Sequence, residues 1–544
     1  MKIKNILSAF FLAGFSLIVS SCSEDFFKTM PTESVSDETA LSTTDNAYAV
    51  LNGIAKTMTT QQAYFGSGFC GENHVMIKME EYPAENYNYN YYASGWAPLF
   101  NQTFNTASNR IYCSYAWAYY YNLIGQANMV IARIDAASGS AEEKNFIKAS
   151  ALTFRSFAFE KLIRYYCHRW KDSNNGADPG LVLKLDDSTN SFPLSTLLET
   201  YNQIYQDLDK AIELFGNAKD MRGSDVWIPN VNVAHAVYAR AALSREDYKT
   251  ALEHATAAKD GYPLMSNDAY VSGFCKPTSE WIMGSFGSAE ENNWYWSYGT
   301  QYSCNGYYAN ESDCGAGTIG HELITRIPNE DIRKKLFLTE DKFPAYDFSY
   351  NSEDVDNYFR TFGIIGITNE KMWEDVDAYI SSMTPDGLDR AYSSGTFYLD
   401  GQLKFWVTDL PGVSYLPFIR TSEMVLIEAE CHYFLGDEVA AQASLEELNK
   451  KSGRNPNYSC TKTGDDLFNE IKDYRALELW GEGFEWSDLK RWNLPAVRKS
   501  FEEGGNTHVS VAITIKPTDG NNWTWKIPDA EIDYNDYLKV AAEK

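Results

Sequence analysis

The segment NVAHAVYARAALSREDYKTALEHATAAKDG, residues 232–261, decides the fold. Small and apolar residues recur in it every three or four positions, which predicts two short helices joined by a turn. The same spacing of small and apolar residues returns later in the chain. The matching positions are Ala239, Ala251, Ala255 and Ala258 in the first copy and Ala429, Ala441, Leu445 and Leu448 in the second. The chain therefore contains an internal helical repeat.

Small residues at these offsets resemble tetratricopeptide units, in which two antiparallel helices pack closely. Two matches leave generic helical hairpins as the alternative. Helical periodicity also covers the following stretches: residues 37–58, 116–135, 141–167, 195–216, 419–436, 437–453 and 464–483. We predict a mainly α fold built on a scaffold of helical hairpins.

The predicted single domain spans residues 37–544, with its helical scaffold at about 37–60, 110–261 and 419–493. Residues 61–109 and 265–415 lack a sustained helical period and are rich in Gly, Ser, Asn and aromatic side chains. They are predicted to be long irregular excursions. Excursions of this length are uncommon in compact domains unless they are functional.

The N-terminus reads as an export signal. Two lysines precede an apolar run at residues 6–19, which is too short to span a bilayer comfortably. Cys22 follows small residues, an arrangement that resembles the lipobox of bacterial lipoproteins, and the acidic SED after it resembles a surface-export signal of Bacteroidetes lipoproteins. We expect a signal peptide at residues 1–21 and a lipidated tether at 22–36. The alternative is a plain signal peptide with an incidental cysteine.

Composition and charge limit the classes of partner that the protein is expected to bind. The 544 residues include 37 Tyr, 29 Phe and 14 Trp, so the chain can bury a large core. The net charge of −27 argues against nucleic acid and disfavours electrostatic docking on anionic lipid. A neutral ligand suits an acidic, aromatic-rich protein better than a polyanion does.

Eight cysteines remain after Cys22, an even number that permits disulfides in an exported chain. Cys304 and Cys314 flank a Gly-rich polar segment and are the best candidate pair. Free buried thiols are the alternative, and they are favoured for Cys167 and Cys431, which lie in helical patterns.

Catalytic and metal motifs are missing. The seven histidines are scattered without a zinc spacing, and there is no GxSxG elbow and no Walker A loop. Two carboxylates could still meet in a cleft as the acid and base of a glycoside hydrolase, which a sequence cannot show. We expect a non-enzymatic protein without a cofactor. A bound calcium ion has no supporting motif.

Two aromatic clusters occur outside the helices. One lies within residues 80–105 and carries no charge from residue 86 on, and the other, within residues 292–310, carries no charge at all. A flat aromatic ring covers the apolar C–H face of a sugar, and Asn supplies both a donor and an acceptor for hydroxyl groups. If residues 87–91 are extended, their tyrosines face one side and their asparagines the other. The alternative is that these rings cover the flanks of the helices. The candidate binding residues are Tyr91, Trp96, Asn101, Trp294, Tyr295 and Trp296.

Four motifs give the chain a family resemblance: RALELWGEGFEWSDLKRWN (475–493), PFIRTSEMVLIEAECHYFLGD (417–437), KASALTFRSFAFEKLIRYY (148–166) and WKIPDAEI (525–532). Together they resemble the SusD/RagB family, the surface glycan-binding lipoproteins of Bacteroidetes. The motifs mix Arg, Glu and Trp on or beside predicted helices. This composition suits ion-paired helix packing rather than a binding site.

The resemblance implies one mostly helical domain with four tetratricopeptide-like units and an irregular ligand-binding side. It also implies a protein anchored on the outer membrane that captures an oligosaccharide and closes over a SusC-like, TonB-dependent transporter. Trp96 and Asn101 are further apart than the Trp and Asn of the starch-binding prototype, so the sugar itself does not transfer. A peptide or other nutrient carrier, a glycoside hydrolase and a purely structural lid remain the competing interpretations.

Overall fold

The computed structural model describes the chain in separate stretches. The described residues are 40–66, 69–88, 96–286, 299, 302–306, 317–348, 361–362, 370–389, 397–408, 414–519 and 523–542. The predicted export signal, the tether and Cys22 lie outside these residues. No helix within the described stretches is long and apolar enough to cross a membrane.

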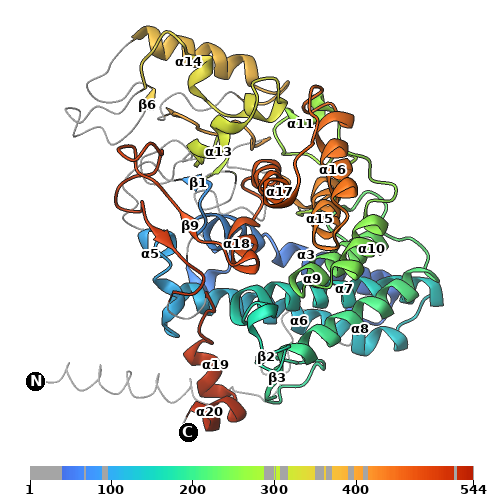
Figure 1. Ribbon diagram of the computed structural model, residues 1–544. Coiled ribbons are helices and arrows are strands. Elements are labelled where there is room, and N and C mark those ends of the chain that lie inside the picture. Colours follow the sequence, from blue (N-terminus) through green and yellow to red (C-terminus); the bar gives the residue numbers. More distant parts are fainter. Residues whose placement is uncertain are drawn as a thin grey trace, which may run out of the picture.

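Antiparallel helix pairs make up the lower and right-hand parts of the molecule (Figure 1). The longer helices are α3 (Thr44–Thr57), α6 (Ile111–Arg133), α7 (Ala141–Tyr166), α8 (Leu197–Phe215), α9 (Val231–Ser244), α10 (Tyr248–Ala258), α14 (Glu370–Met383), α15 (Thr421–Phe434), α16 (Glu438–Glu446), α17 (Gly464–Glu478) and α18 (Glu485–Trp492). Neighbours in sequence pack together, and α10 joins the two groups by packing on α15. The predicted mainly α scaffold of helical hairpins is confirmed.

The remaining elements are short. The short α-helices are α4 (Gly71–His74), α5 (Ala97–Phe100), α11 (Asn267–Tyr270), α13 (His321–Arg326), α19 (Asp529–Tyr534) and α20 (Asp536–Ala542). Single turns of 3₁₀-helix cover Ala63–Phe65, Phe104–Thr106, Ile134–Ala136, Trp170–Asp172, Ile332–Leu336 and Glu340–Lys342, and π-helical turns cover Val75–Glu81 and Glu447–Lys451. These turns mostly connect or extend the main helices.

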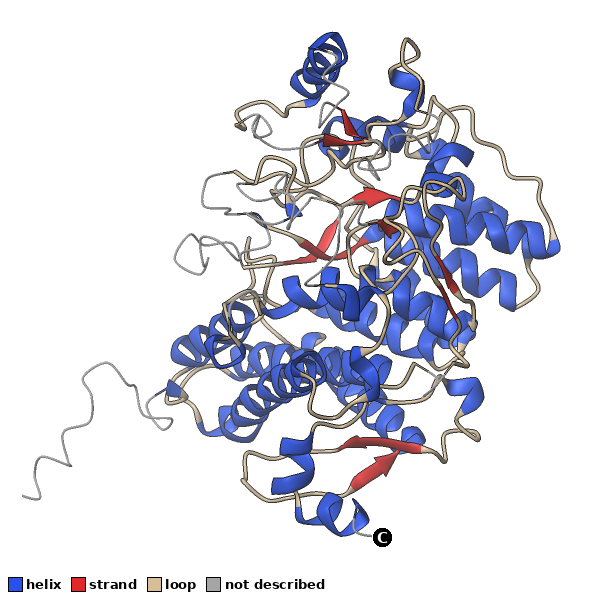
Figure 2. Ribbon diagram, turned by 90° about the vertical axis from the view of Figure 1, so that its left-hand side faces the viewer, coloured by secondary structure: helices blue, strands red, loops and turns tan. Residues whose placement is uncertain are grey.

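The strands form antiparallel pairs rather than one sheet, and Figure 2 shows them scattered between the helices. The pairs are β1 (Tyr87–Asn88) with β5 (Thr318–Ile319), β2 (Pro179–Val182) with β3 (Leu194–Thr196), β4 (Trp281–Gly284) with β8 (Pro417–Arg420), β6 (Thr361–Phe362) with β7 (Phe397–Tyr398), and β9 (Ala496–Val497) with β10 (Thr514–Ile515). Several of these pairs join segments that are far apart in sequence, so they position loops on the helical scaffold.

The internal repeat is confirmed by α9–α10 and α15–α16. All eight matched positions are at most 1 % exposed, which lets the paired helices approach closely. The correspondence extends into the turns. Glu246 and Gly436 both have positive φ, at 59° and 82°, and each is followed by an aspartate that caps the next helix. The two hairpins therefore share their turn chemistry as well as their packing.

Helices α3 and α15 begin later than the periodicity predicts. Helix α3 begins at Thr44 rather than near residue 37, because the Thr43 hydroxyl accepts a hydrogen bond from the Asn46 N–H at 3.1 Å and caps the helix there. Helix α15 begins at Thr421 rather than at residue 419, because the preceding residues pair with β4 as strand β8.

The predicted excursions are more structured than expected. Within the first, α4 continues into a π-helical turn, Val75–Glu81, whose seven residues are all buried. Within the second, α14 packs Val376 and Ile380 against Leu338, Leu399 and Trp406 in a small hydrophobic cluster of its own. The prediction of irregular structure across both segments is therefore wrong in these parts. Short apolar runs here find buried partners that a periodicity search does not reveal.

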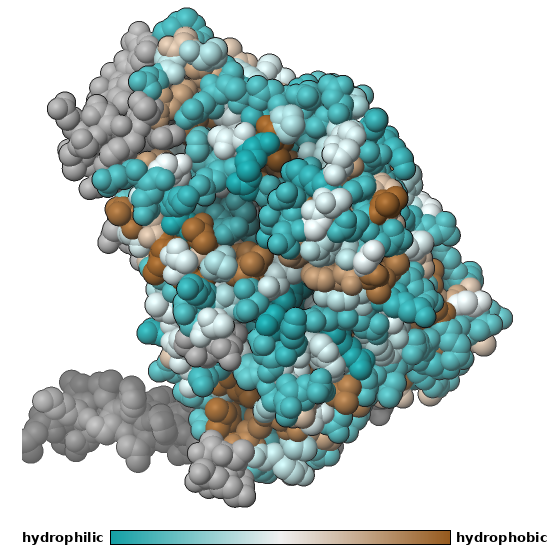
Figure 3. Space-filling view, viewed as in Figure 1, coloured by the Kyte–Doolittle hydropathy of each residue, from teal (hydrophilic) through white to brown (hydrophobic). Residues whose placement is uncertain are grey.

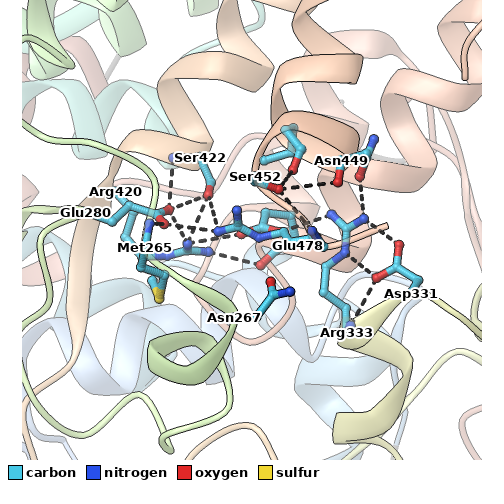
Figure 4. Close-up of polar contacts among 12 residues, drawn as sticks. Met265, Asn267, Glu280, Asp331, Arg333, Arg420, Ser422, Asn449, Ser452 and Glu478 are labelled. Atoms are coloured by element: carbon cyan, nitrogen blue, oxygen red, sulfur yellow. Dashed lines mark hydrogen bonds and ion pairs between the residues drawn. The ribbon is translucent and has the colours of Figure 1, made fainter. Parts of the chain in front are cut away.

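A buried ion network ties the C-terminal motifs to the rest of the fold (Figure 4). Arg420 contacts Glu280 at 2.6 Å and Glu482 at 2.7 Å, and Arg454 contacts Glu280 at 3.0 Å. Arg333 reaches Glu478 at 3.0 Å. All of these side chains are at most 3 % exposed. The prediction that the motif residues serve ion-paired helix packing is confirmed.

The network also sets the charge of its carboxylates. Burial alone would raise the pKa of Glu478, but Arg454, Arg420 and Arg333 outweigh it and hold that pKa below its usual value. Glu478 is therefore held ionised. The helices that carry these residues are fixed against one another by charge as well as by apolar packing.

Candidate functional site

The short helix α5 carries two of the predicted binding residues at its ends. Trp96 is the N-cap and Asn101 follows the last helical residue. Pro98 lies in the first turn, where its fixed φ favours a helical start. Leu99 and Phe100 are fully buried and hold the helix against the core. The helix thus places Trp96 and Asn101 one turn apart.

Trp96 is half-buried and its ring has defined neighbours. The Nζ atom of Lys78 lies 3.7 Å from the ring centroid, and the ring of Tyr82 meets the indole edge-on at 6.3 Å. A buried ammonium over an aromatic face is an attractive contact that fixes the ring's orientation. The indole is therefore held in place while part of it stays accessible.

Asn101 offers an unused acceptor. The residue is half-buried, and its Oδ1 atom has no hydrogen-bond partner among the described residues. Buried amide oxygens are nearly always paired in folded proteins. The unpaired oxygen, at the opposite end of α5 from Trp96, is therefore a candidate acceptor for a hydroxyl donor of a ligand.

The two aromatic clusters converge on this helix. The ring of Tyr82 contacts both Trp96 and Tyr302, the latter at 6.4 Å. Strand β1 pairs with β5 in a register that joins Tyr87 to Ile319. Gly317 has φ +78°, and a Cβ there would approach the Tyr87 ring to 2.2 Å, so glycine permits this pairing. Segments more than 200 residues apart therefore meet at one place.

The second cluster is anchored on its C-terminal side. The Gln402 side chain donates to the Tyr302 carbonyl at 2.7 Å, and the Asn305 side chain accepts from the Val407 N–H at 2.9 Å. Residues 302–306 are thereby held by the chain that follows strand β7.

Several residues of the first cluster belong to the core. Tyr82 and Tyr87 are each 1 % exposed, and Tyr87 stacks on Trp480 at 4.8 Å. Asn88 is buried as well, donating to Asn506 at 2.8 Å and accepting from Thr507 at 2.6 Å. The alternative interpretation, that the rings are packed in the core rather than exposed to a ligand, is correct for the two tyrosines, and Asn88 is buried with them.

The other predicted residues fall outside the described stretches: Tyr91, Trp294, Tyr295, Trp296 and Cys314. The proposed disulfide of Cys304 with Cys314 is therefore still a prediction. Cys167 and Cys431 are buried free thiols in helices or at their ends, as predicted. In the part of the chain that the structure describes, no group of three His, Cys, Asp or Glu residues could hold a metal ion.

A second concave feature, the central cavity, opens between α17, α18, β9 and residues 81–86 and has a volume of about 540 Å³. Figure 3 shows a hollow in this region of the surface. Its lining includes Glu85, Glu485, Lys472 and Arg475 and an apolar side formed by Trp492 and Leu494. The sequence did not point to this cavity, because residues 85 and 485 are 400 positions apart.

Carboxylates of the central cavity carry shifted pKa values. Burial raises the pKa of Glu85, and burial together with Glu85 and Glu81 raises that of Glu485 well above its usual value. Glu81, whose Oε1 accepts from the N–H groups of Gly483 and Phe484, has its pKa raised to about 8, first by burial. The cavity is a site of under-compensated negative charge.

The pKa of Glu81 predicts a pH dependence of stability. A free glutamate titrates near 4.5, so this residue's contribution is fully present below about pH 4.5 and is lost as pH rises through about 8. Glu81→Gln stays neutral and keeps an acceptor oxygen. We expect it to gain stability over the wild type by at most ~1.4 kcal/mol per pH unit in this window. Thermal unfolding of both proteins between pH 5 and 9 measures the gain, and parallel curves would contradict the assignment.

Two family models match different parts of this chain. A family model described as "SusD family" matches residues 279–541, and another described as "Starch-binding associating with outer membrane" matches residues 36–243. No match was found among curated proteins. The two models together cover most of the chain.

Solved structures share the fold. A SusD-like carbohydrate-binding protein from Bacteroides vulgatus is 20 % identical, with a TM-score of 0.67 over 91 % of this chain and 97 % of that one. A SusD superfamily protein from Bacteroides thetaiotaomicron is 21 % identical, with a TM-score of 0.66 over 91 % and 98 %. A laminarin-binding SusD-like protein is 16 % identical, with a TM-score of 0.58 over 90 % and 97 %. At these identities the likeness establishes the fold alone.

Proposed function

We propose, on the premise that this chain belongs to the SusD/RagB family of glycan-binding proteins, that it captures a neutral oligo- or polysaccharide at the cell surface and delivers it to a TonB-dependent transporter. It holds the glycan without cleaving it. The observation that carries the proposal is the position of Trp96 and Asn101 at the ends of α5, where the two aromatic segments meet.

The chemistry of this place fits a sugar. The accessible part of the Trp96 indole would cover a C–H face, and the unpaired Oδ1 of Asn101 would accept a hydroxyl proton. Tyr91, Trp294, Tyr295 and Trp296 would complete the face from the adjoining segments. The net charge of −27 favours an uncharged glycan over a polyanionic one.

The family's association with the outer membrane supports a surface location. Lipidation of Cys22 would anchor the chain there, and a SusC-like transporter would take up the captured glycan. Replacing Cys22 by Ala should release the protein from the membrane fraction on cell lysis. Membrane association that survives this substitution would remove the lipid anchor from the account.

Affinity electrophoresis of the mature chain against neutral polysaccharides, with laminarin among them, tests the function. We expect at least one of them to retard migration and a sulfated polysaccharide of similar size not to. Release of reducing ends from a retained glycan would select the glycoside hydrolase instead. Retention of peptides alone would select a peptide carrier, and retention of nothing would select a structural lid.

A further inference from the structure

The central cavity is separate from the aromatic site and has charges that the fold does not neutralise. Neither Glu85 nor Glu485 makes an ion pair within 4 Å of any described residue. Glu85 and Glu485 are half-buried, whereas the fully buried acidic side chains Glu478, Glu482 and Asp488 of the C-terminal motifs all make ion pairs. Among the described residues the two cavity carboxylates accept only N–H donors. Glu85 accepts from the Val497 N–H at 3.0 Å, and Glu485 accepts from the backbone N–H of Asn86 at 2.9 Å and from the Asn86 side chain.

The central cavity also has a positive side chain without an ion-pair partner among the described residues. Of the cations that line it, Arg326 pairs with Asp473, Lys462 with Glu470, and Arg475 with Asp488. Within the described stretches Lys472 makes no ion pair, and burial lowers its pKa.

Two buried arginines near the cavity also lack full compensation. Arg475 is 3 % exposed, lines the cavity, and has an Nη1 atom without a hydrogen-bond partner among the described residues. Arg498 follows Val497, which lines the cavity, and among the described residues it donates hydrogen bonds only to backbone carbonyls.

Charges of both signs therefore face one cavity. Lys472 and Glu85 influence each other electrostatically, but among the described residues neither of them forms an ion pair within 4 Å. Leaving such groups uncompensated is costly, and a ligand that brings the opposite charge to each of them recovers that cost. The volume of about 540 Å³ lies in the range of small-molecule sites, and Trp492, Leu494 and Pro495 form a half-buried apolar side. A molecule with two opposite charges and an apolar group matches all three features.

We propose that the central cavity binds a small zwitterion with an apolar side chain, of the amino acid type. Its ammonium group lies against Glu85 and Glu485, its carboxylate against Lys472 and the free donor of Arg475, and its side chain against Trp492 and Leu494. This is a second site, and it shares no residue with the predicted glycan-binding set.

Three molecules with one skeleton test the proposal by titration calorimetry on the full mature chain at pH 7. Phenylalanine carries both charges, N-acetylphenylalanine lacks the ammonium, and phenylalaninamide lacks the carboxylate. We expect saturable binding of phenylalanine, about tenfold weaker binding of the amide and at least about tenfold weaker binding of the acetyl compound. No saturable binding of phenylalanine, or equal binding of all three, would overturn the proposal.

Variants give an independent readout. Glu485→Gln should weaken phenylalanine binding by about tenfold or more and leave the weak binding of N-acetylphenylalanine unchanged. Lys472→Met removes the proposed partner of the ligand's carboxylate. It should therefore weaken the binding of phenylalanine more than the binding of phenylalaninamide, which has no carboxylate. The probe series on the wild-type protein decides the matter if a variant does not fold. Because the two sites are separate, failure of glycan binding would not change these expectations.

Discussion

Arg420→Met is expected to lower the free energy of unfolding by ~3–5 kcal/mol, the largest stability effect that we expect from a single substitution. Arg420 is 1 % exposed and makes ion pairs with three buried glutamates, Glu280, Glu478 and Glu482. Methionine of similar length removes the positive charge and leaves these carboxylates uncompensated. Urea unfolding of the mature chain at pH 7 measures the loss.

A surface pair provides the matched control. Arg133 contacts Asp187 at 2.9 Å, but the two side chains are 37 % and 36 % exposed. Arg133→Met should therefore cost less than ~1 kcal/mol. If the two substitutions had equal effects, the buried network would not stabilise the fold in the way described.

Trp96→Ala is expected to weaken glycan binding by about tenfold or more, equal to ~1.4 kcal/mol or more, because it removes the ring held at the head of α5. Trp96→Phe keeps an aromatic face and should retain part of the affinity. Trp296→Ala should weaken retention in the same way, if the second segment supplies the opposite wall. Affinity electrophoresis against the retained polysaccharide measures each variant.

Tyr534→Ala is the control for a nonspecific aromatic effect. Tyr534 is 86 % exposed on α19, which lies at the lower end of the molecule and away from α5 (Figure 1). Its removal should leave retention unchanged. Retention that is unchanged in both Trp96→Ala and Trp296→Ala would remove these tryptophans from the site.

Much of the fold follows from local sequence. The repeated small residues at Ala239 and Ala429 are buried in the paired helices, and Arg and Glu residues of the C-terminal motifs form part of the buried network. These features can be predicted from the sequence for two reasons. The repeat depends on residue spacing within single helices, and the network depends on charged residues that need partners of opposite charge when they are buried. The short helix that begins after Trp96 could not be predicted in this way, because four residues are too few for a periodicity argument, and the binding role of Trp96 stays a prediction.

The rest depends on contacts between distant segments. Tyr87 is buried because Trp480 stacks on it, and no pattern near residue 87 indicates that partner. The buried turn Val75–Glu81 is too short for a periodicity argument. The central cavity is harder still to predict, because nothing in the sequence indicates that Glu85 and Glu485 lie close together in the fold.

Hydrogen-exchange mass spectrometry with and without a retained polysaccharide tests the central claim most directly. We propose that the glycan lies where the two aromatic segments meet. Peptides covering residues 96–101 and 292–310 should then both exchange more slowly when the glycan is bound, while α19 and α20 do not change. Slower exchange confined to other regions, with both aromatic segments unaffected, would contradict it.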